Sequence, residues 1–142
     1  MHQYLTRIYA TLYSRGDVEI QFLYSEQPTR LDGRVRGRLR FYDGSTLTFE
    51  EKVIKRGRSI ERISYRYHYQ RADGTLGFRY DNAPHHPEVL TFPDHIHIEG
   101  HVEAAEPPDL SEVLHRIDGL LYPTGQQDSV LNNQAEERES DS

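Results

Sequence analysis

The sequence contains no cysteine and no tryptophan, and it has a single methionine among 142 residues. The lack of cysteine excludes disulfide bridges, thiolate zinc sites and a cysteine nucleophile. No run of about 18 apolar residues is present, so we expect no membrane-spanning helix. The first residues include no apolar stretch typical of a secretory signal. These features favour a cytoplasmic protein.

Apolar residues are also scarce, at 35% of the chain, and the mean hydropathy is −0.82. A chain of this length usually forms one domain, which we predict over residues 1–122. The segment 123–142 is acidic and has almost nothing apolar to bury. We predict that this tail is disordered, because burial cannot offset the entropy lost on ordering it.

Charge is distributed unevenly along the chain. The formal net charge is −6, but residues 30–79 contain 13 Lys and Arg against 6 Asp and Glu. Residues 80–122 contain one Arg against 9 acidic residues. A basic half on an acidic protein favours a phosphate-binding surface or a surface for an acidic partner. The alternative is a solvated sheet whose charges the acidic half offsets.

Alternating apolar residues predict strands over 18–24, 34–42, 45–54, 60–70 and 75–80. Asp43-Gly44 and Asp73-Gly74 predict tight hairpin turns, the first with a two-residue loop, and 55–58 forms another connection. In the first strand we expect Val18, Ile20 and Phe22 to share a face. Neighbouring strands joined by such short turns predict an antiparallel meander.

Two helices accompany these strands. Apolar residues at helical spacing predict a short helix over 5–13, and Asp109 with Glu112 forms a capping-box pattern for a second helix. The apolar face of the second helix comprises Leu110, Val113, Leu114, Ile117, Leu120 and Leu121. The predicted fold class is α+β: a curved antiparallel β-sheet of about five strands, packed by the C-terminal helix and a short N-terminal helix.

A row of arginines alternates with apolar residues over 34–41. Because side chains alternate across a strand, Arg34, Arg36, Arg38 and Arg40 share one face, where they could bind phosphates of RNA. Arg66 and His68 share a face of the strand 60–70 and are further candidates for RNA binding. Three tyrosines (65, 67 and 69) share the other face. The tyrosines form either a core face or a platform for base stacking.

Five of the eight histidines lie between residues 77 and 101: His85, His86, His95, His97 and His101. Prolines at 84, 87 and 93 stiffen this segment. Alternation over 95–102 predicts that His95, His97, Glu99 and His101 point the same way, unless a bulge at Gly100 breaks this phase before His101. Imidazole and carboxylate groups at this spacing could hold a metal, with His95, His97 and Glu99 as the candidate ligands.

The same segment supports a metal-independent alternative. RNA cleavage needs a base for the 2′-OH proton, an acid for the leaving oxygen, and a cation for the phosphorane-like charge. His85, His86 and His97 could supply the base and the acid, Arg79 the cation, and Asp81 could orient an imidazole. The other interpretation is that Asp81, His85 and His86 only stabilise the loop by hydrogen bonds.

The chain resembles the TumE-like toxins of bacterial toxin–antitoxin systems over about residues 4–121. The resemblance is carried by 63–70 (ISYRYHYQ), 78–88 (FRYDNAPHHPE), 91–93 (TFP), His95-x-His97 and the acidic, proline-containing run before the second helix. Family members usually carry a further histidine where Asp94 stands.

The resemblance implies a small toxin that is neutralised by a helix-turn-helix, DNA-binding antitoxin. From the residues we predict that the toxin acts on RNA as a ribonuclease that needs no cofactor. Two alternatives stay open: a metal-dependent hydrolase or nuclease, and an inhibitor that binds RNA or protein without catalysis. Homo-oligomer formation is also left open.

Overall fold

The computed structural model describes residues 1–123, so the disorder predicted for the acidic tail concerns residues outside the described part, apart from residue 123. The chain forms two compact units, Met1–Leu110 and a second that begins at Ser111. A single domain over 1–122 stays a prediction. No helix within residues 1–123 is long and apolar enough to cross a lipid bilayer.

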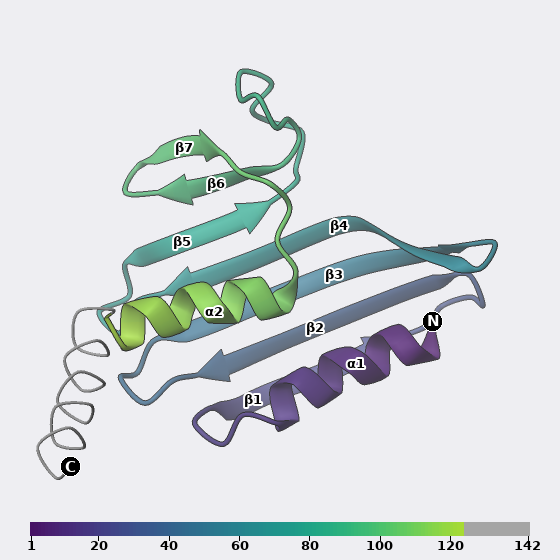
Figure 1. The fold of residues 1–142 in the computed structure, drawn as a ribbon, viewed down its shortest axis with the longest axis horizontal. Helices are drawn as coiled ribbons and strands as arrows, with labels where there is room; N and C mark the ends of the chain where they lie inside the picture. The colour runs from purple at the N-terminus through teal and green to yellow at the C-terminus, as the bar shows by residue number, and fades with distance from the viewer. Residues whose placement is uncertain (124–142) are drawn as a thin grey trace, which may run out of the picture. The chain divides into compact units, whose positions relative to one another are not determined.

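The first unit contains one sheet, in which seven antiparallel strands follow each other in chain order (Figure 1). The strands are β1 (Glu19–Glu26), β2 (Asp32–Arg40), β3 (Thr46–Arg56), β4 (Ser59–Gln70), β5 (Leu76–Asp81), β6 (His95–Ile98) and β7 (His101–Ala104). The α+β class and the antiparallel sheet are confirmed. The expectation of about five strands is wrong, because the histidine-rich segment adds two more.

The Asp-Gly turns lie where they were expected, but they differ in type from a two-residue loop. Phe41 N–H donates to the Ser45 carbonyl (2.9 Å), and Gly44 N–H donates to the Phe41 carbonyl (3.0 Å). Gly44 has a φ of 89°, so the connection is a type I turn followed by a glycine bulge. The Asp43 carboxylate accepts a hydrogen bond from Ser45 N–H (2.9 Å). Asp73-Gly74 repeats the pattern.

A tight turn divides the histidine-rich segment into β6 and β7. Glu99 and Gly100 both have left-handed backbone conformations, with φ values of 48° and 80°, as a two-residue hairpin of type I′ requires. His101 pairs with Ile98 across this turn, so it lies on the sheet face opposite to His97. The prediction that Glu99 and His101 continue the histidine face of β6 is therefore wrong.

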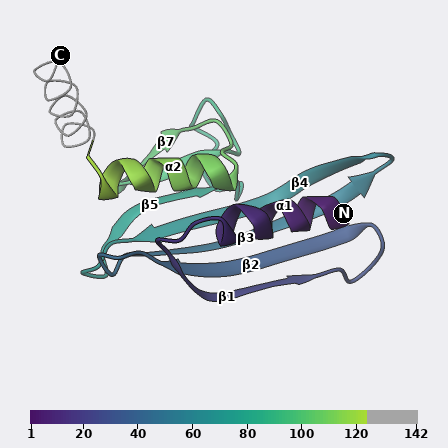
Figure 2. The ribbon, with the colours of Figure 1, turned by 60° about the horizontal axis from the view of Figure 1, so that its bottom comes forward.

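Helix α1 (His2–Tyr13) covers one face of the sheet and confirms the expected N-terminal helix. Its buried residues Leu5, Ile8 and Leu12 are spaced along one side of the helix. Tyr4 donates a hydrogen bond to the buried carboxylate of Glu51 on β3. Figures 1 and 2 show α1 lying along the strands of the sheet, near its β1 end in the view of Figure 1.

The three tyrosines of β4 belong to the core on this covered face. Tyr65, Tyr67 and Tyr69 are buried, and the rings of Tyr67 and Tyr69 stack on Phe49 and Phe78. Between the two interpretations of the tyrosine row, core packing is confirmed. These rings cannot act as an open platform for bases.

A bulge in β1 places Phe22 on the opposite face from the core. Ile20 pairs with Leu39, but the register shifts by one residue and Phe22 then pairs with Arg38. The expectation that Phe22 shares a face with Ile20 is wrong, because one additional residue in a strand reverses the faces that follow. Phe22 thus lies on the arginine face of the sheet.

Helix α2 (Leu110–Leu121) confirms the predicted C-terminal helix. Its buried residues are Leu110, Val113, Leu114, Ile117 and Leu121, as the helical spacing predicts. Leu120 differs from the prediction, because it is 54% exposed. Packing of this helix on the sheet stays a prediction.

Gly37 allows β2 to lie close to the aromatic core. A Cβ atom at Gly37 would lie 2.7 Å from Cε1 of Phe49 and 3.1 Å from Cδ1 of Leu23. We expect Gly37→Ala to lower the free energy of unfolding by about 1–3 kcal/mol, because these core side chains must shift. Thermal unfolding measures the effect. Gly16→Ala is the control, because no heavy atom lies within 4 Å of its Cβ position. Equal melting temperatures for the two variants would contradict this account.

Candidate functional site

Pairing between β5 and β6 brings charged and imidazole side chains together. Arg79 pairs with His97, and Asp81 pairs with His95. Directly opposed residues in an antiparallel pair point to the same face, so all four side chains lie on one side of the sheet. This face is opposite to the buried tyrosines, because Arg79 and Asp81 alternate with Phe78 and Tyr80 along β5.

The Asp81 carboxylate is at the centre of this group and is only 6% exposed. Its Oδ2 lies 3.1 Å from Nε of Arg79, and its Oδ1 lies 3.1 Å from Nε2 of His95. Oδ1 also accepts a hydrogen bond from the backbone N–H of Ala83 (3.0 Å), and Oδ2 lies 3.7 Å from Nε2 of His97. A buried carboxylate needs such partners, and here they fix its orientation.

His95 is almost fully buried and connects the loop to the carboxylate. Its Nδ1 donates to the Pro93 carbonyl (2.8 Å), and its Nε2 lies 3.1 Å from both Asp81 Oδ1 and His97 Nε2. Arg79 Nη2 lies 3.0 Å from the same His97 nitrogen. Because guanidinium groups only donate, His97 Nε2 accepts the hydrogen bond from Arg79.

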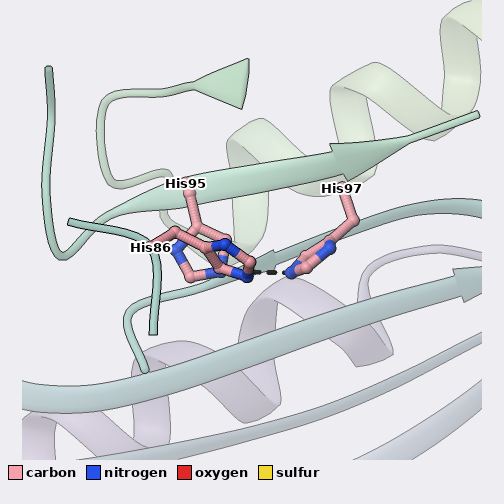
Figure 3. A group of neighbouring side chains, drawn as sticks. All are labelled: His86, His95 and His97. Carbon is pink, nitrogen blue, oxygen red and sulfur yellow. Dashed lines mark hydrogen bonds between the residues drawn. The ribbon is translucent and has the colours of Figure 1, made fainter. Parts of the chain in front are cut away.

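His86 approaches the pair from the loop between β5 and β6. Its ring centroid lies 4.9 Å from that of His95 and 5.4 Å from that of His97, both in edge-on geometry. Its Nδ1 lies 3.2 Å from a carboxylate oxygen of Glu88. Figure 3 shows the three rings facing one another, with His95 and His97 on one strand and His86 on the neighbouring chain segment.

The surroundings of His97 disfavour its charged form. Burial lowers the pKa of His97 below its ordinary value of 6.5, and the Arg79 guanidinium lowers it further, while the Asp81 carboxylate opposes the shift. The pKa of His68 is also lowered, by burial and by the guanidiniums of Arg66 and Arg79. Both rings are therefore neutral at pH 7, and both lie in a region of positive charge.

The three imidazoles are also residues that could hold a metal ion. One ring nitrogen from each of His86, His95 and His97 lies within 4.8 Å of the others. The structure thus brings His86, rather than Glu99, next to the pair on β6. The second ring nitrogens of His86 and His95 face oxygen acceptors, as is usual for metal-binding histidines. The Arg79 guanidinium opposes a cation here, because it lies against the nitrogen that His97 would offer.

The other predicted histidines lie elsewhere. His85 is exposed; it lines the same cleft but is not among the three converging rings. His101 is exposed on β7 and contacts Glu103 (2.7 Å). Asp94 accepts a hydrogen bond from the Tyr65 hydroxyl (2.6 Å).

A cleft of about 560 Å³ opens in front of the three imidazoles. Arg79, Asp81, Arg66 and Glu50 are among the residues that line it. The cleft is wide and polar, and it could hold a charged ligand rather than an apolar one. We name the group formed by Arg79, Asp81, His86, His95 and His97 the histidine cluster.

The arginine row lies on the same sheet face as the histidine cluster. Arg34, Arg36, Arg38 and Arg40 are all exposed, while the residues between them are buried, so the predicted alternation is confirmed. Two rows of successive cross-strand partners connect this strand to the cluster: Arg38, Thr48, His68, Arg79, His97 and Arg36, Glu50, Arg66, Asp81, His95. Four strand spacings separate β2 from β6, about 19 Å in all.

Two features of this face were not expected from the sequence. His95 was considered only as a metal ligand, but it forms the buried link between Asp81 and His97. Glu50 lines the cleft between Arg36 and Arg66 and was not singled out. Neither role has a local signal, because both depend on strand register between segments far apart in the chain.

Fold and site together define a small α+β protein with imidazole, carboxylate and guanidinium groups on a basic sheet face. The family model of toxin TumE matches residues 8–120, so the chain belongs to the TumE toxin family, and the expected resemblance is confirmed. The protein is therefore a toxin of a toxin–antitoxin system, and the family implies an antitoxin partner. Neither a curated protein nor a solved structure matches the chain.

The charges around His97 predict how its pKa responds to substitution. Removing the Arg79 charge by Arg79→Gln should raise the pKa of His97 towards 6.5, and Asp81→Asn should lower it further. NMR titration of the imidazole resonances measures both shifts. Arg40→Gln is the control, because Arg40 lies on β2, four strand positions from His97. An unchanged pKa of His97 in Arg79→Gln would contradict the contact between the two groups.

Proposed function

We propose that this toxin is a ribonuclease that cleaves RNA without a metal ion, with the histidine cluster as its reactive centre. The observation that carries the proposal is the contact between a neutral imidazole and a guanidinium: Arg79 Nη2 lies 3.0 Å from His97 Nε2. These groups are a proton acceptor and a stabiliser of phosphate charge, side by side in one cleft. The arginine row extends from this cleft and would bind the phosphates of the same RNA strand.

In the proposed reaction, the Arg79 guanidinium moves from His97 Nε2 to the phosphate, and the freed Nε2 accepts the proton of a ribose 2′-OH. The 2′-oxygen then forms a bond to the adjacent phosphorus. The bond from phosphorus to the 5′-oxygen breaks, and that oxygen takes a proton from His86. The products carry a 2′,3′-cyclic phosphate and a 5′-OH. Arg79 would stabilise the negative charge that develops on the phosphoryl oxygens.

Asp81 and His95 would act as positioning residues. His95 is only 1% exposed, so it does not reach the RNA, but it holds His97 through the contact between their Nε2 atoms. Asp81 contacts Arg79 and both histidines of β6, and it would keep the acceptor nitrogen and the guanidinium in one orientation. His86 and His97 are the more exposed rings and line the cleft.

A toxin that cleaves RNA acts in the cytoplasm, and we propose that its antitoxin carries a helix-turn-helix domain. The basic sheet face favours RNA over a small metabolite, because a row of exposed guanidiniums matches a chain of phosphates.

Substitution of the cluster should abolish toxicity. We expect His97→Ala and Arg79→Ala to reduce RNA cleavage by about 10²–10⁴-fold and to relieve growth arrest, because each removes a group needed in the transition state. RNA profiling after brief expression would reveal cut sites that are present only with the unsubstituted toxin. His101→Ala is the matched control, since this histidine lies on the opposite sheet face. Growth arrest that survives both cluster substitutions would contradict the proposal.

The same experiment separates cleavage from binding. An inhibitor that acts only by occupying RNA or protein would stay toxic without the cluster. It would lose toxicity when Arg36 and Arg38 are both replaced by Gln, because those side chains would hold the phosphates. Such an inhibitor would produce no RNA cut sites, whether or not the histidine cluster is intact.

Metal removal and pH test the chemistry. We expect cleavage to continue at an unchanged rate in excess EDTA. We also expect the rate to fall as the pH is lowered through the pKa of His97, below 6.5, because the protonated ring cannot accept the 2′-OH proton. The pH at which the rate falls is set by the charged and titratable groups around this ring, which are Arg79, Asp81, His86 and His95. If EDTA abolishes RNA cleavage and added zinc or manganese restores it, the result would instead favour the metal-dependent alternative, with three imidazoles as ligands.

A further inference from the structure

A second hollow lies beside the histidine cluster on the same sheet face. It encloses about 310 Å³ over β1 to β4, and Thr48 on β3 lies between Arg38 and His68 in the cross-strand row. Thr48 is short and its neighbours are long, so the sheet surface is depressed at this point. Glu50 and Arg66 line both this hollow and the cleft in front of the cluster. A ligand in the cleft could therefore continue into the hollow.

Guanidinium groups border the hollow on two sides. Arg36 and Arg38 lie on β2, and Arg66 lies on β4. Arg38 donates to the Thr48 hydroxyl (3.1 Å), and Arg36 is 4.0 Å from the Glu50 carboxylate. Among residues 1–123, Arg66 forms no ion pair. Positive charge therefore exceeds negative charge around the hollow, as an anionic ligand requires.

An aromatic ring closes one end of the hollow. Phe22 reaches this face only because of the bulge in β1, and it lines the hollow instead of entering the core. The guanidinium carbon of Arg38 lies over the Phe22 ring, 5.8 Å from its centroid. The ring centroids of Phe22 and Tyr24 are 5.9 Å apart. Aromatic rings next to arginines on an exposed sheet are a known platform for stacking single-stranded bases.

Glu50 supplies the only carboxylate among the described residues that line the hollow. It lies between Arg36 and Arg66 in the cross-strand row, and its side chain is 44% exposed. A carboxylate carries two oxygens that accept hydrogen bonds side by side. Guanine presents two adjacent donors, N1–H and the 2-amino group, on its Watson–Crick edge. No other standard base offers this pair to a carboxylate.

We propose that this hollow is a nucleotide subsite that selects guanine in single-stranded RNA. Phe22 stacks on the base, Glu50 accepts hydrogen bonds from its N1–H and 2-amino group, and Arg66 binds an adjacent phosphate. The inference rests on the proposed ribonuclease function for its substrate. Three strand spacings, about 14 Å, separate Thr48 from His97, so the subsite holds a nucleotide near the cleaved bond, not the one being cleaved.

Inosine provides the test, because it lacks only the 2-amino group of guanine. Binding is measured by fluorescence anisotropy with 2′-O-methyl RNA, which cannot be cleaved through a 2′-OH, and cleavage is measured with the matching RNA. We expect the protein to bind the guanine oligonucleotide at least about fivefold more tightly than the inosine one. Glu50→Gln should make the two affinities equal. Phe22→Leu should weaken the binding of both oligonucleotides by about tenfold.

The control for Glu50→Gln is Glu61→Gln. Glu61 is an exposed glutamate of β4 that pairs with Arg56, and it lines neither the hollow nor the cleft. An equal affinity for guanine and inosine, or a ratio that Glu50→Gln leaves unchanged, would overturn the subsite. Selective binding of guanine without any cleavage would support the subsite and refute the ribonuclease. Cleavage without base selection would support the ribonuclease and refute the subsite.

Discussion

The carboxylate of Asp81 is the contact on which the rest of the site depends. It is buried, and its oxygens contact a guanidinium, a backbone N–H and the Nε2 atom of His95, with that of His97 slightly farther away. A buried carboxylate without partners costs several kcal/mol, so these groups are held in one arrangement. The pairing of β5 with β6 supplies that arrangement, since it places each histidine opposite a charged residue.

The two faces of the sheet have different roles: one forms the core, and the other carries the polar groups of the candidate site. On one face, tyrosines, phenylalanines and aliphatic residues form a core beneath α1. On the other face of the described sheet, the arginines of β2 remain exposed, while Asp81 and His95 are buried within the histidine cluster. This division follows from alternation in each strand, and the short turns preserve it from β2 to β5. A long, basic surface therefore leads to a compact group of imidazoles.

Several elements were predictable because their signals are local. The Asp-Gly turns, the arginine alternation and both helices depend on residues within about ten positions of each other. Two of the errors arose where one residue changes the phase of a strand. An extra residue near Ile20 moved Phe22 to the other face, and the Glu99-Gly100 turn moved His101 away from His97. Such a change reverses every side chain that follows it, and neither bulge nor turn has a strong signature here.

By itself, the sequence determined the α+β class, the family, the basic strand and the importance of the histidine-rich segment. Periodicity predicts the class and the basic strand, because it acts over neighbouring residues, whereas the family is indicated by the resemblance of motifs such as 78–88. Only the tertiary structure decided which histidines meet, that His86 and not Glu99 joins the pair on β6, and that Glu50 lies between the arginines and the cluster. Those contacts depend on register between distant strands, which no local pattern encodes.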